Sequence, residues 1–169
     1  MDERSPLDTS GIRGLAFFKP NKAARVEAIF VLTPDAKPFE LPTYSGITKT
    51  YRKFGEATFL WENDTTSLAL YESMRLIGNP IYKDYLFLPF MDETNNLTTY
   101  GGGRYLNMSK ADTEDGKVII DFNLCYNPWC AYSDGYNCPI PPMENHLSFS
   151  VEAGEKKFEG TFRGSKEDH

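Results

Sequence analysis

The sequence is poor in histidine, in cysteine and in long hydrophobic runs, and each shortage narrows the class of protein. With 2 histidines, His146 and the terminal His169, few imidazole groups are offered for catalysis or metal binding. No stretch approaches the roughly 18 consecutive apolar residues of a membrane-spanning helix. The N-terminal region also lacks a basic stretch followed by an apolar core. We therefore expect no membrane span, no export signal and a cytoplasmic location as the chain stands, or an extracytoplasmic one if a leader was removed.

Positive charge is scarce as well. The net charge is -6, the pI is about 5.0, and the basic residues are scattered rather than gathered into a stripe. Such a chain has little to attract a phosphate backbone, so we expect no nucleic-acid partner. The length of 169 residues suits one domain over 1–169, without repeats or linkers, and its polar ends, 1–4 and 160–169, are expected to be mobile.

Short runs of β-forming residues recur at hairpin spacing, with almost no helical periodicity. In 48–61 apolar residues alternate with polar ones, which predicts a strand with one buried face. One short helical turn is expected, capped by Asp8, Thr9 or Ser10. We expect extended segments at 25–32, 39–43, 48–61, 67–74, 85–90, 97–106, 117–124 and 147–151. The pattern predicts a mainly β fold with little helix, either an antiparallel β-sandwich or a partly open β-barrel.

The segment 121–145 is the most unusual part of the chain. It holds all 3 cysteines and 4 of the 11 prolines. Proline fixes φ and removes an amide donor, so this segment cannot form a long helix or strand. We expect it to be irregular, with backbone groups that find their partners elsewhere in the fold.

An odd number of cysteines leaves at least one thiol without a partner in the chain. Cys130 and Cys138 enclose a short loop, and they are either bridged in an oxidising compartment or two thiols in a reducing one. A metal site would use them with His146, but a fourth ligand is missing unless Cys125 supplies it. We therefore expect neither a metal nor a cofactor. Asn63, Asn96 and Asn107 each begin a glycosylation sequon, and we interpret these short patterns as chance.

A catalytic trio of cysteine, histidine and asparagine would have to be built from Cys130 or Cys138 with His146. The favoured alternative is a half-exposed histidine beside a loop. The three glycines at 101–103 indicate a bulge, a positive φ or a group pressed against the main chain. They lack the spacing and the following helix of a phosphate-binding loop.

Arg104 follows these glycines and is the natural donor for a buried carboxylate. Its expected partners are Asp121 and Glu144, with Asp92 as a further candidate, because buried carboxylates persist only when paired or hydrogen-bonded. Such a pair would either brace 121–145 against the sheet or line a ligand pocket. The expected pocket is framed by Tyr100, Arg104, Asp121, Asn123, Tyr126, Asn127, Tyr132, Glu144 and Asn145.

Two blocks, YGGGRY at 100–105 and YNPWCAYSDGYNCPIPPMEN at 126–145, are long and unusual. With RVEAIF and VEAGEKKF, and in the same order and spacing, they make the chain resemble the prokaryotic domain of unknown function 1684 family over about 5–158. The resemblance implies no activity. It does imply that the cysteine pair of the family lies at Cys130 and Cys138, which leaves Cys125 as the extra one.

The leading interpretation is a small β-rich domain that binds a small polar or anionic ligand around Arg104 and 121–145. One alternative is a hydrolase that uses a carboxylate of the same cluster. Another is a structural or interaction module of the cell envelope without a ligand. A deep cavity with Arg104 pointing into it would favour binding, and two carboxylates converging on solvent would favour hydrolysis. A fully paired Arg104 without a cavity would favour the structural role. The oligomeric state is left open.

Overall fold

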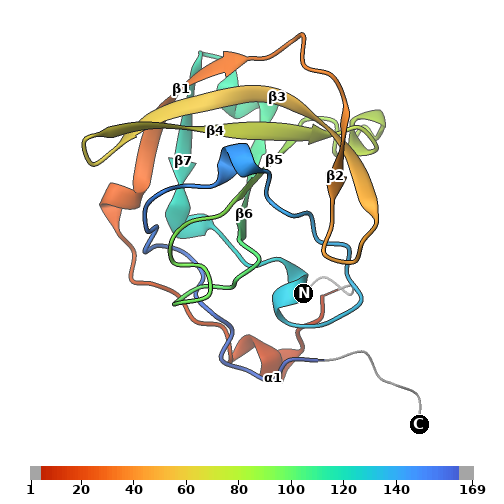
Figure 1. The fold of residues 1–169 in the computed structure, drawn as a ribbon, viewed down its shortest axis with the longest axis vertical. Coiled ribbons are helices and arrows are strands. Elements are labelled where there is room, and N and C mark those ends of the chain that lie inside the picture. The colour runs from red at the N-terminus through yellow and green to blue at the C-terminus, as the bar shows by residue number, and fades with distance from the viewer. Residues whose placement is uncertain (1–4, 164–169) are drawn as a thin grey trace.

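The computed structural model describes residues 5–163, and its framework is an antiparallel sheet that curls into an open half-barrel (Figure 1). The 7-stranded sheet has the order β6-β5-β4-β3-β1-β7, and β2 pairs with β3. The strands are β1 (Arg25–Leu32), β2 (Phe39–Pro42), β3 (Thr48–Trp61), β4 (Asp64–Ser73), β5 (Tyr85–Phe90), β6 (Arg104–Ser109) and β7 (Lys117–Asp121). The predicted mainly β class, with a partly open barrel as one of its two forms, is confirmed.

Helical structure is sparse, as expected. The one α-helix in the described range, α1 (Thr9–Ile12), is capped by Asp8, whose carboxylate accepts a hydrogen bond from Gly11 N at 2.8 Å. The other helical pieces are single 3-10 turns: η1 (Lys22–Ala24), η2 (Leu76–Gly78), η3 (Lys110–Thr113), η4 (Phe122–Leu124), η5 (Trp129–Ala131) and η6 (Met143–Asn145).

The expected strands at 25–32, 48–61 and 85–90 coincide with β1, β3 and β5. The strand expected at 97–106 is wrong for most of its length, because β6 begins only at Arg104. Two residues with positive φ, Asn96 at 66° and Gly103 at 90°, bound a series of turns here. A Cβ at Gly103 would lie 2.6 Å from the carbonyl oxygen of Phe90, so the backbone at Gly103 approaches the backbone of β5 too closely for a side chain.

The strand expected at 147–151 is also wrong. Leu147 and Val151 do point into the core, as the alternation predicted. The backbone of this stretch nevertheless belongs to no strand. Val151 N donates instead to the Asp92 carboxylate at 2.7 Å. Likewise, the strand expected at 117–124 ends at Asp121, where η4 begins.

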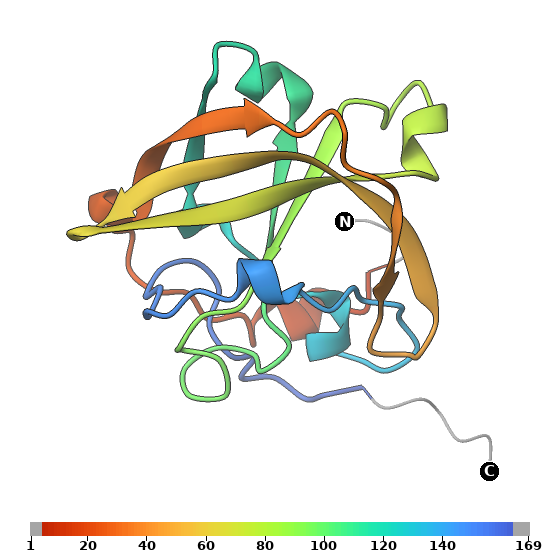
Figure 2. The ribbon, with the colours of Figure 1, turned by 45° about the horizontal axis from the view of Figure 1, so that its top comes forward.

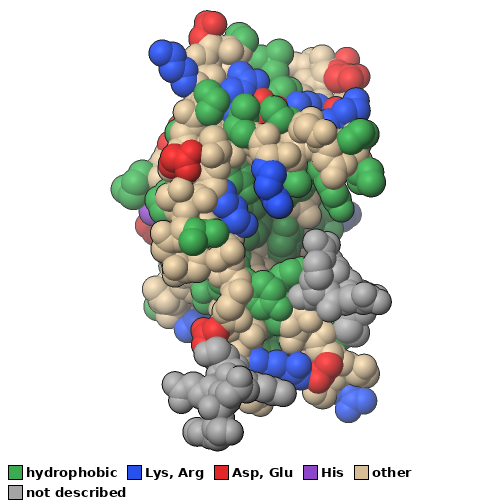
Figure 3. Space-filling model, turned by 90° about the vertical axis from the view of Figure 1, so that its right-hand side faces the viewer, with side chains coloured by type: hydrophobic (Ala, Val, Ile, Leu, Met, Phe, Trp, Pro, Cys, Tyr) green, Lys and Arg blue, Asp and Glu red, His purple; other side chains and the backbone are tan. Residues whose placement is uncertain are grey.

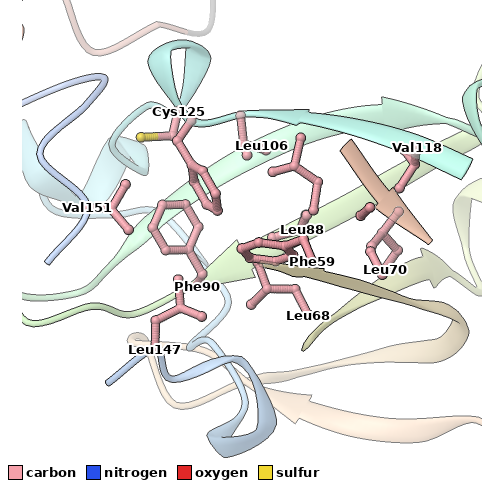
Figure 4. Packing of buried hydrophobic residues seen from close by; sticks show 14 of the residues in the cluster. Phe59, Leu68, Leu70, Leu88, Phe90, Leu106, Val118, Cys125, Leu147 and Val151 are labelled. Carbon is pink, nitrogen blue, oxygen red and sulfur yellow. The ribbon is translucent and has the colours of Figure 1, made fainter. Parts of the chain in front are cut away.

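The main hydrophobic core fills the inside of the half-barrel (Figure 4). Alternation along the strands directs Leu68 and Leu70 of β4 into it, together with Leu88 and Phe90 of β5. Residues from the irregular part of the chain close this core from the other side, among them Phe122, Cys125, Leu147, Val151 and Ala153.

A second core lies on the opposite face of the same strands. Its members alternate in sequence with those of the first core, and they are Leu41, Tyr51, Ala69, Tyr71, Phe87 and Tyr105. The irregular segment covers this face, and its turn η6 packs on β4 (Figure 2). Strands β4 and β5 are therefore buried on both faces, which explains the continuous apolar run of 85–90.

A register shift in β3 lets one long strand serve both faces. The ladder with β4 changes between Lys53 and Gly55. Beyond the shift, Ala57 and Phe59 point into the main core, whereas before it Tyr51 points to the second core. A bulge of this kind bends the strand and increases its twist.

The described part of the polar tail is attached to the fold. Arg163 N donates to Tyr132 O at 2.8 Å, and Asp134 N donates to Arg163 O at 3.1 Å. The expected mobility of 160–163 stays a prediction. The expectations for 1–4 and 164–169 lie outside the described residues. No helix within 5–163 has the length and hydropathy to cross a membrane.

Candidate functional site

Arg104 contacts neither Asp121 nor Glu144, and its carboxylate partner is the further candidate, Asp92. Its side chain is fully buried, Nη2 lies 3.3 Å from the carboxylate of Asp92, and Nη2 also donates to Val151 O at 2.8 Å. Nη1 donates to the carbonyl oxygens of Ala153 and Glu155. The arginine therefore holds 151–155 against the main core by hydrogen bonds. It lines none of the three cavities.

The positions of the strands explain why Arg104 does not meet Asp121 or Glu144. Arg104 lies on the same side of β6 as Leu106 and faces the main core. Asp121 alternates with the buried Ile120 on β7 and points away from that core. Glu144 lies with η6 on the opposite face of the sheet. Periodicity assigned each residue a side of its own strand, but it carried no information on which strands share a face.

Asp121 and Asn123 form a local brace. Asp121 Oδ1 accepts hydrogen bonds from the backbone N and from Nδ2 of Asn123, at 3.0 and 2.9 Å, and so caps η4. Asn123 also pairs with the backbone of Asn21 in both directions. These polar groups hold the chain before β1 to the end of β7.

Glu144 and Asn145 attach the irregular segment to the second face. Asn145 is fully buried. Its side-chain amide accepts a hydrogen bond from Ala69 N at 2.8 Å and donates to Ala69 O and Pro89 O. It thus takes the place of backbone hydrogen bonds between β4 and β5. Glu144 accepts from the Tyr71 hydroxyl and from Lys53 Nζ, the latter at 3.1 Å. The segment is thus clamped to the sheet, but by this pair and without Arg104.

Glu155 is a buried carboxylate that the sequence analysis missed. It accepts hydrogen bonds from the backbone N and Nδ2 of Asn127, each at 2.9 Å, and from the Tyr132 hydroxyl. Burial raises the pKa of this carboxyl, while the donors act against that shift. The sequence did contain a signal for such a carboxylate. Asn127 and Tyr132 carry amide and hydroxyl donors, and these need an acceptor when they are buried.

The nine expected pocket residues therefore do not surround one pocket. Asn127, Tyr132, Arg104 and Asn145 are buried in hydrogen-bond networks. Tyr100 lines a cavity of about 420 Å³ beside Tyr44, and Asp121 lines another of about 640 Å³ between β6 and β7. Of the nine, Tyr126 alone lines the largest of the three cavities described here.

That largest cavity, of about 1110 Å³, lies between the second face of the sheet and the loop 126–139. Figure 3 shows this side of the molecule hollowed, with hydrophobic side chains in the hollow and Lys or Arg side chains at its upper edge. The floor consists of Tyr51, Phe87 and Tyr105, which belong to the second core. Trp129 and Tyr136 line it from the loop side.

The aromatic rings of the cavity hold one another in place. Phe87 lies edge-on to Tyr105, with ring centroids 4.7 Å apart, and Trp129 lies edge-on to Tyr136 at 5.1 Å. Asn107 Oδ1 accepts hydrogen bonds from the hydroxyls of Tyr85 and Tyr126, at 2.8 and 2.6 Å. These rings are therefore positioned before any ligand arrives.

The Tyr51 hydroxyl has no hydrogen-bond partner among residues 5–163, although the side chain is largely buried. Burial raises the pKa of this phenol to about 12, so it stays protonated at neutral pH. A protonated hydroxyl at the floor of a cavity is a donor and an acceptor for a ligand.

Cys130 and Cys138 form a disulfide that closes the loop carrying Tyr136, directly after Trp129, and Cys125 is a buried free thiol. Burial raises the pKa of Cys125 to about 11. The catalytic trio is not assembled, because both loop cysteines are bonded to each other and His146 Nε2 contacts Pro141 O at 3.1 Å. Across the described chain, no group of three or more His, Cys, Asp or Glu residues is arranged to hold a metal ion.

Comparison with known proteins gives a family and a related structure. The family model described as "Protein of unknown function (DUF1684)" matches residues 10–156. The solution NMR structure of an uncharacterized protein from Haloarcula marismortui is similar to the chain, with a TM-score of 0.67 and 33% sequence identity. The similarity covers 84% of this chain and 75% of that one. A comparison with curated proteins gives no match.

Proposed function

This chain belongs to the DUF1684 family of proteins of unknown function, and from its largest cavity we propose that it binds a small organic ligand with a flat apolar group. One observation carries the proposal: the second core is not closed. Its rings Tyr51, Phe87 and Tyr105 form the floor of an open cavity. Ligand sites in proteins are typically concave, mostly apolar and of about this size, with a few polar groups that fix orientation.

The energetics support the same interpretation. An apolar ligand that fills the cavity removes from water the apolar surface that its lining still exposes, for example at the half-buried Tyr126 and Trp129, which stabilises the complex by roughly 25 cal/mol for each Å² buried. The hydrogen bonds of Asn107 to Tyr85 and Tyr126 already order two of the rings, so binding orders few side chains. Tyr51 offers a hydroxyl without a partner in the described chain.

Binding is favoured over the hydrolase alternative by the partners of the carboxylates. Asp121 is engaged by Asn123, and Glu144 by Tyr71 and Lys53. Asp92 and Glu155 lie close to Arg104 but are buried. None of these carboxylates lines the largest cavity. The role without a ligand is less favoured because it leaves this cavity without a purpose, and concave apolar surfaces typically mark binding sites.

The proposal is tested with phenylnaphthylamine, an uncharged and flat aromatic probe whose fluorescence rises in apolar surroundings. Replacing Trp129 with alanine removes one wall of the cavity, so we expect the affinity for the probe to fall about five- to tenfold. Trp129 is only half-buried, and a thermal unfolding curve checks that the variant is folded.

Tyr82→Ala is the matched control, because this tyrosine is 44% exposed and lies outside the cavity. Its affinity for the probe should equal that of the wild type. Equal affinities of the wild type, Trp129→Ala and Tyr82→Ala would refute binding in this cavity, as would a wild type that does not bind the probe.

A further inference from the structure

We propose that the ligand of this cavity carries an anionic group, a carboxylate, sulfonate or phosphate, that is bound jointly by Lys49 and Arg75. The inference rests on the proposed function and adds the charge of the ligand to it. Both residues line the cavity, Lys49 near the start of β3 and Arg75 just after the end of β4.

The chain path brings the two cations to the same cavity. Tyr51 of β3 pairs with Ser73, the last residue of β4, and Met74 N donates to Thr50 O at 3.0 Å. Lys49 lies two residues before Tyr51 on β3 and therefore points to the same face. Arg75 follows β4 in a turn with helical backbone angles, φ -73° and ψ -41°, and it lines the cavity together with Lys49 and Tyr51.

Two like charges that line the same cavity repel each other unless something neutralises them. Neither Lys49 nor Arg75 forms an ion pair with another residue of 5–163. The carboxylates nearest in register are engaged elsewhere. Glu40 accepts from Thr48 and Thr50, which alternate with Lys49, and Glu72 is held by Arg52 and Lys110.

Lys49 is also partly removed from water. Burial lowers the pKa of its ammonium group, and the neighbouring charge of Arg75 lowers it further. A bound anion would relieve both effects and would accept hydrogen bonds from an ammonium and a guanidinium group. Charge-assisted hydrogen bonds of this kind are among the stronger ones in proteins.

The arrangement therefore selects an amphipathic anion. Its charged group would lie between Lys49 and Arg75, and its flat body would extend over Tyr51 toward Phe87 and Tyr105. The Tyr51 hydroxyl lies between these two regions and can donate to the ligand. A neutral aromatic compound would use the floor alone.

Two probes of similar shape separate the two regions. Anilinonaphthalene sulfonate carries an anionic group, and phenylnaphthylamine is its uncharged counterpart. We expect Lys49→Gln and Arg75→Gln each to weaken binding of the sulfonate about tenfold, as the loss of a hydrogen bond to a charged group does. Binding of phenylnaphthylamine should change less than twofold.

Lys117→Gln is the control, because it removes the same charge from β7, where the side chain is 66% exposed and outside the cavity. Its affinity for both probes should match the wild type. If Lys49→Gln and Arg75→Gln bind the sulfonate as tightly as the wild type, the anion site is refuted while the aromatic site stands. If the wild type binds neither probe, both proposals fail. Equal weakening in Lys117→Gln would show an effect of net charge alone and would also refute the site.

Discussion

At the scale of single residues, the buried charges of this protein serve its architecture. Arg104 neutralises Asp92 and satisfies three backbone carbonyl groups of 151–155. Glu155 in turn satisfies Asn127 and Tyr132 of the irregular segment. Removing one member of such a network leaves a buried polar group unpaired, which costs more than the pair contributes.

Glu155 makes the stability of the fold depend on pH. Its pKa is raised by burial above the ordinary value of 4.5, so the folded state holds a proton that the unfolded state has already released. Its contribution to stability is fully present below pH 4.5 and is lost as the pH rises through the folded pKa. We therefore expect wild type to lose unfolding free energy relative to Glu155→Gln as the pH rises above this value.

Urea unfolding of both proteins between mildly acidic and neutral pH measures this difference. Glu152→Gln serves as the control, because Glu152 is exposed three positions away and should show no such trend. A difference between wild type and Glu155→Gln that stays constant, or that grows in favour of wild type with pH, would contradict the assignment of Glu155 as the titrating group.

At the scale of elements, alternation predicted which side of a segment is buried but not its hydrogen-bond partners. Strands β1, β3 and β5 were predicted with their correct bounds because each has a clear alternating or apolar pattern. Leu147 and Val151 were correctly expected to face the core, yet their stretch is not a strand. Its amides are satisfied by other groups, such as the Asp92 carboxylate, which a local pattern cannot reveal.

The loop 130–138 is the element that joins stability to the proposed site. The disulfide holds Trp129 and Tyr136 against the cavity. We expect the double variant Cys130→Ser, Cys138→Ser to lose roughly 2–3 kcal/mol of unfolding free energy, on the loop-entropy argument. It should also bind phenylnaphthylamine more weakly, because one wall is no longer held.

A thiol titration of the unfolded wild type without reductant checks the premise. It should find one thiol, that of Cys125. Three thiols would rule out the disulfide. Unchanged stability and probe affinity in the double variant would show that the bridge does not support the cavity.

At the scale of the whole molecule, one curled sheet carries two cores of different character. The inner face is filled with aliphatic and phenylalanine side chains, whereas the outer core is rich in tyrosine and remains open beneath the irregular segment. The braces that hold the segment lie at Asn145, Glu144 and Glu155, away from the opening. Charged and amide side chains thus provide these braces, whereas aromatic residues of the second core serve both the fold and the candidate site.

The sequence predicted the fold class, but it could not show that the nine expected pocket residues would lie apart from one another. Lys49 and Arg75 line one cavity only because β4 and the turn after it run back along β3. Phe87 and Tyr105 share this cavity with Trp129 only when the loop folds over the second face. In the sequence, Arg104 stood out because it is a charged residue directly after three glycines. The tyrosines of the cavity, spread over three strands and the irregular segment, formed no pattern that could be recognised in the sequence.

The most direct test of a ligand site between the second face and the irregular segment is an NMR titration that follows the two tryptophan indole N–H signals. Trp129 lines the cavity, whereas Trp61 stacks on Phe149 at 4.8 Å and lies outside it. On addition of anilinonaphthalene sulfonate, we predict that the Trp129 signal shifts in a saturable manner and the Trp61 signal stays in place. A Trp129 signal that does not move, or equal shifts of both signals, would contradict the account.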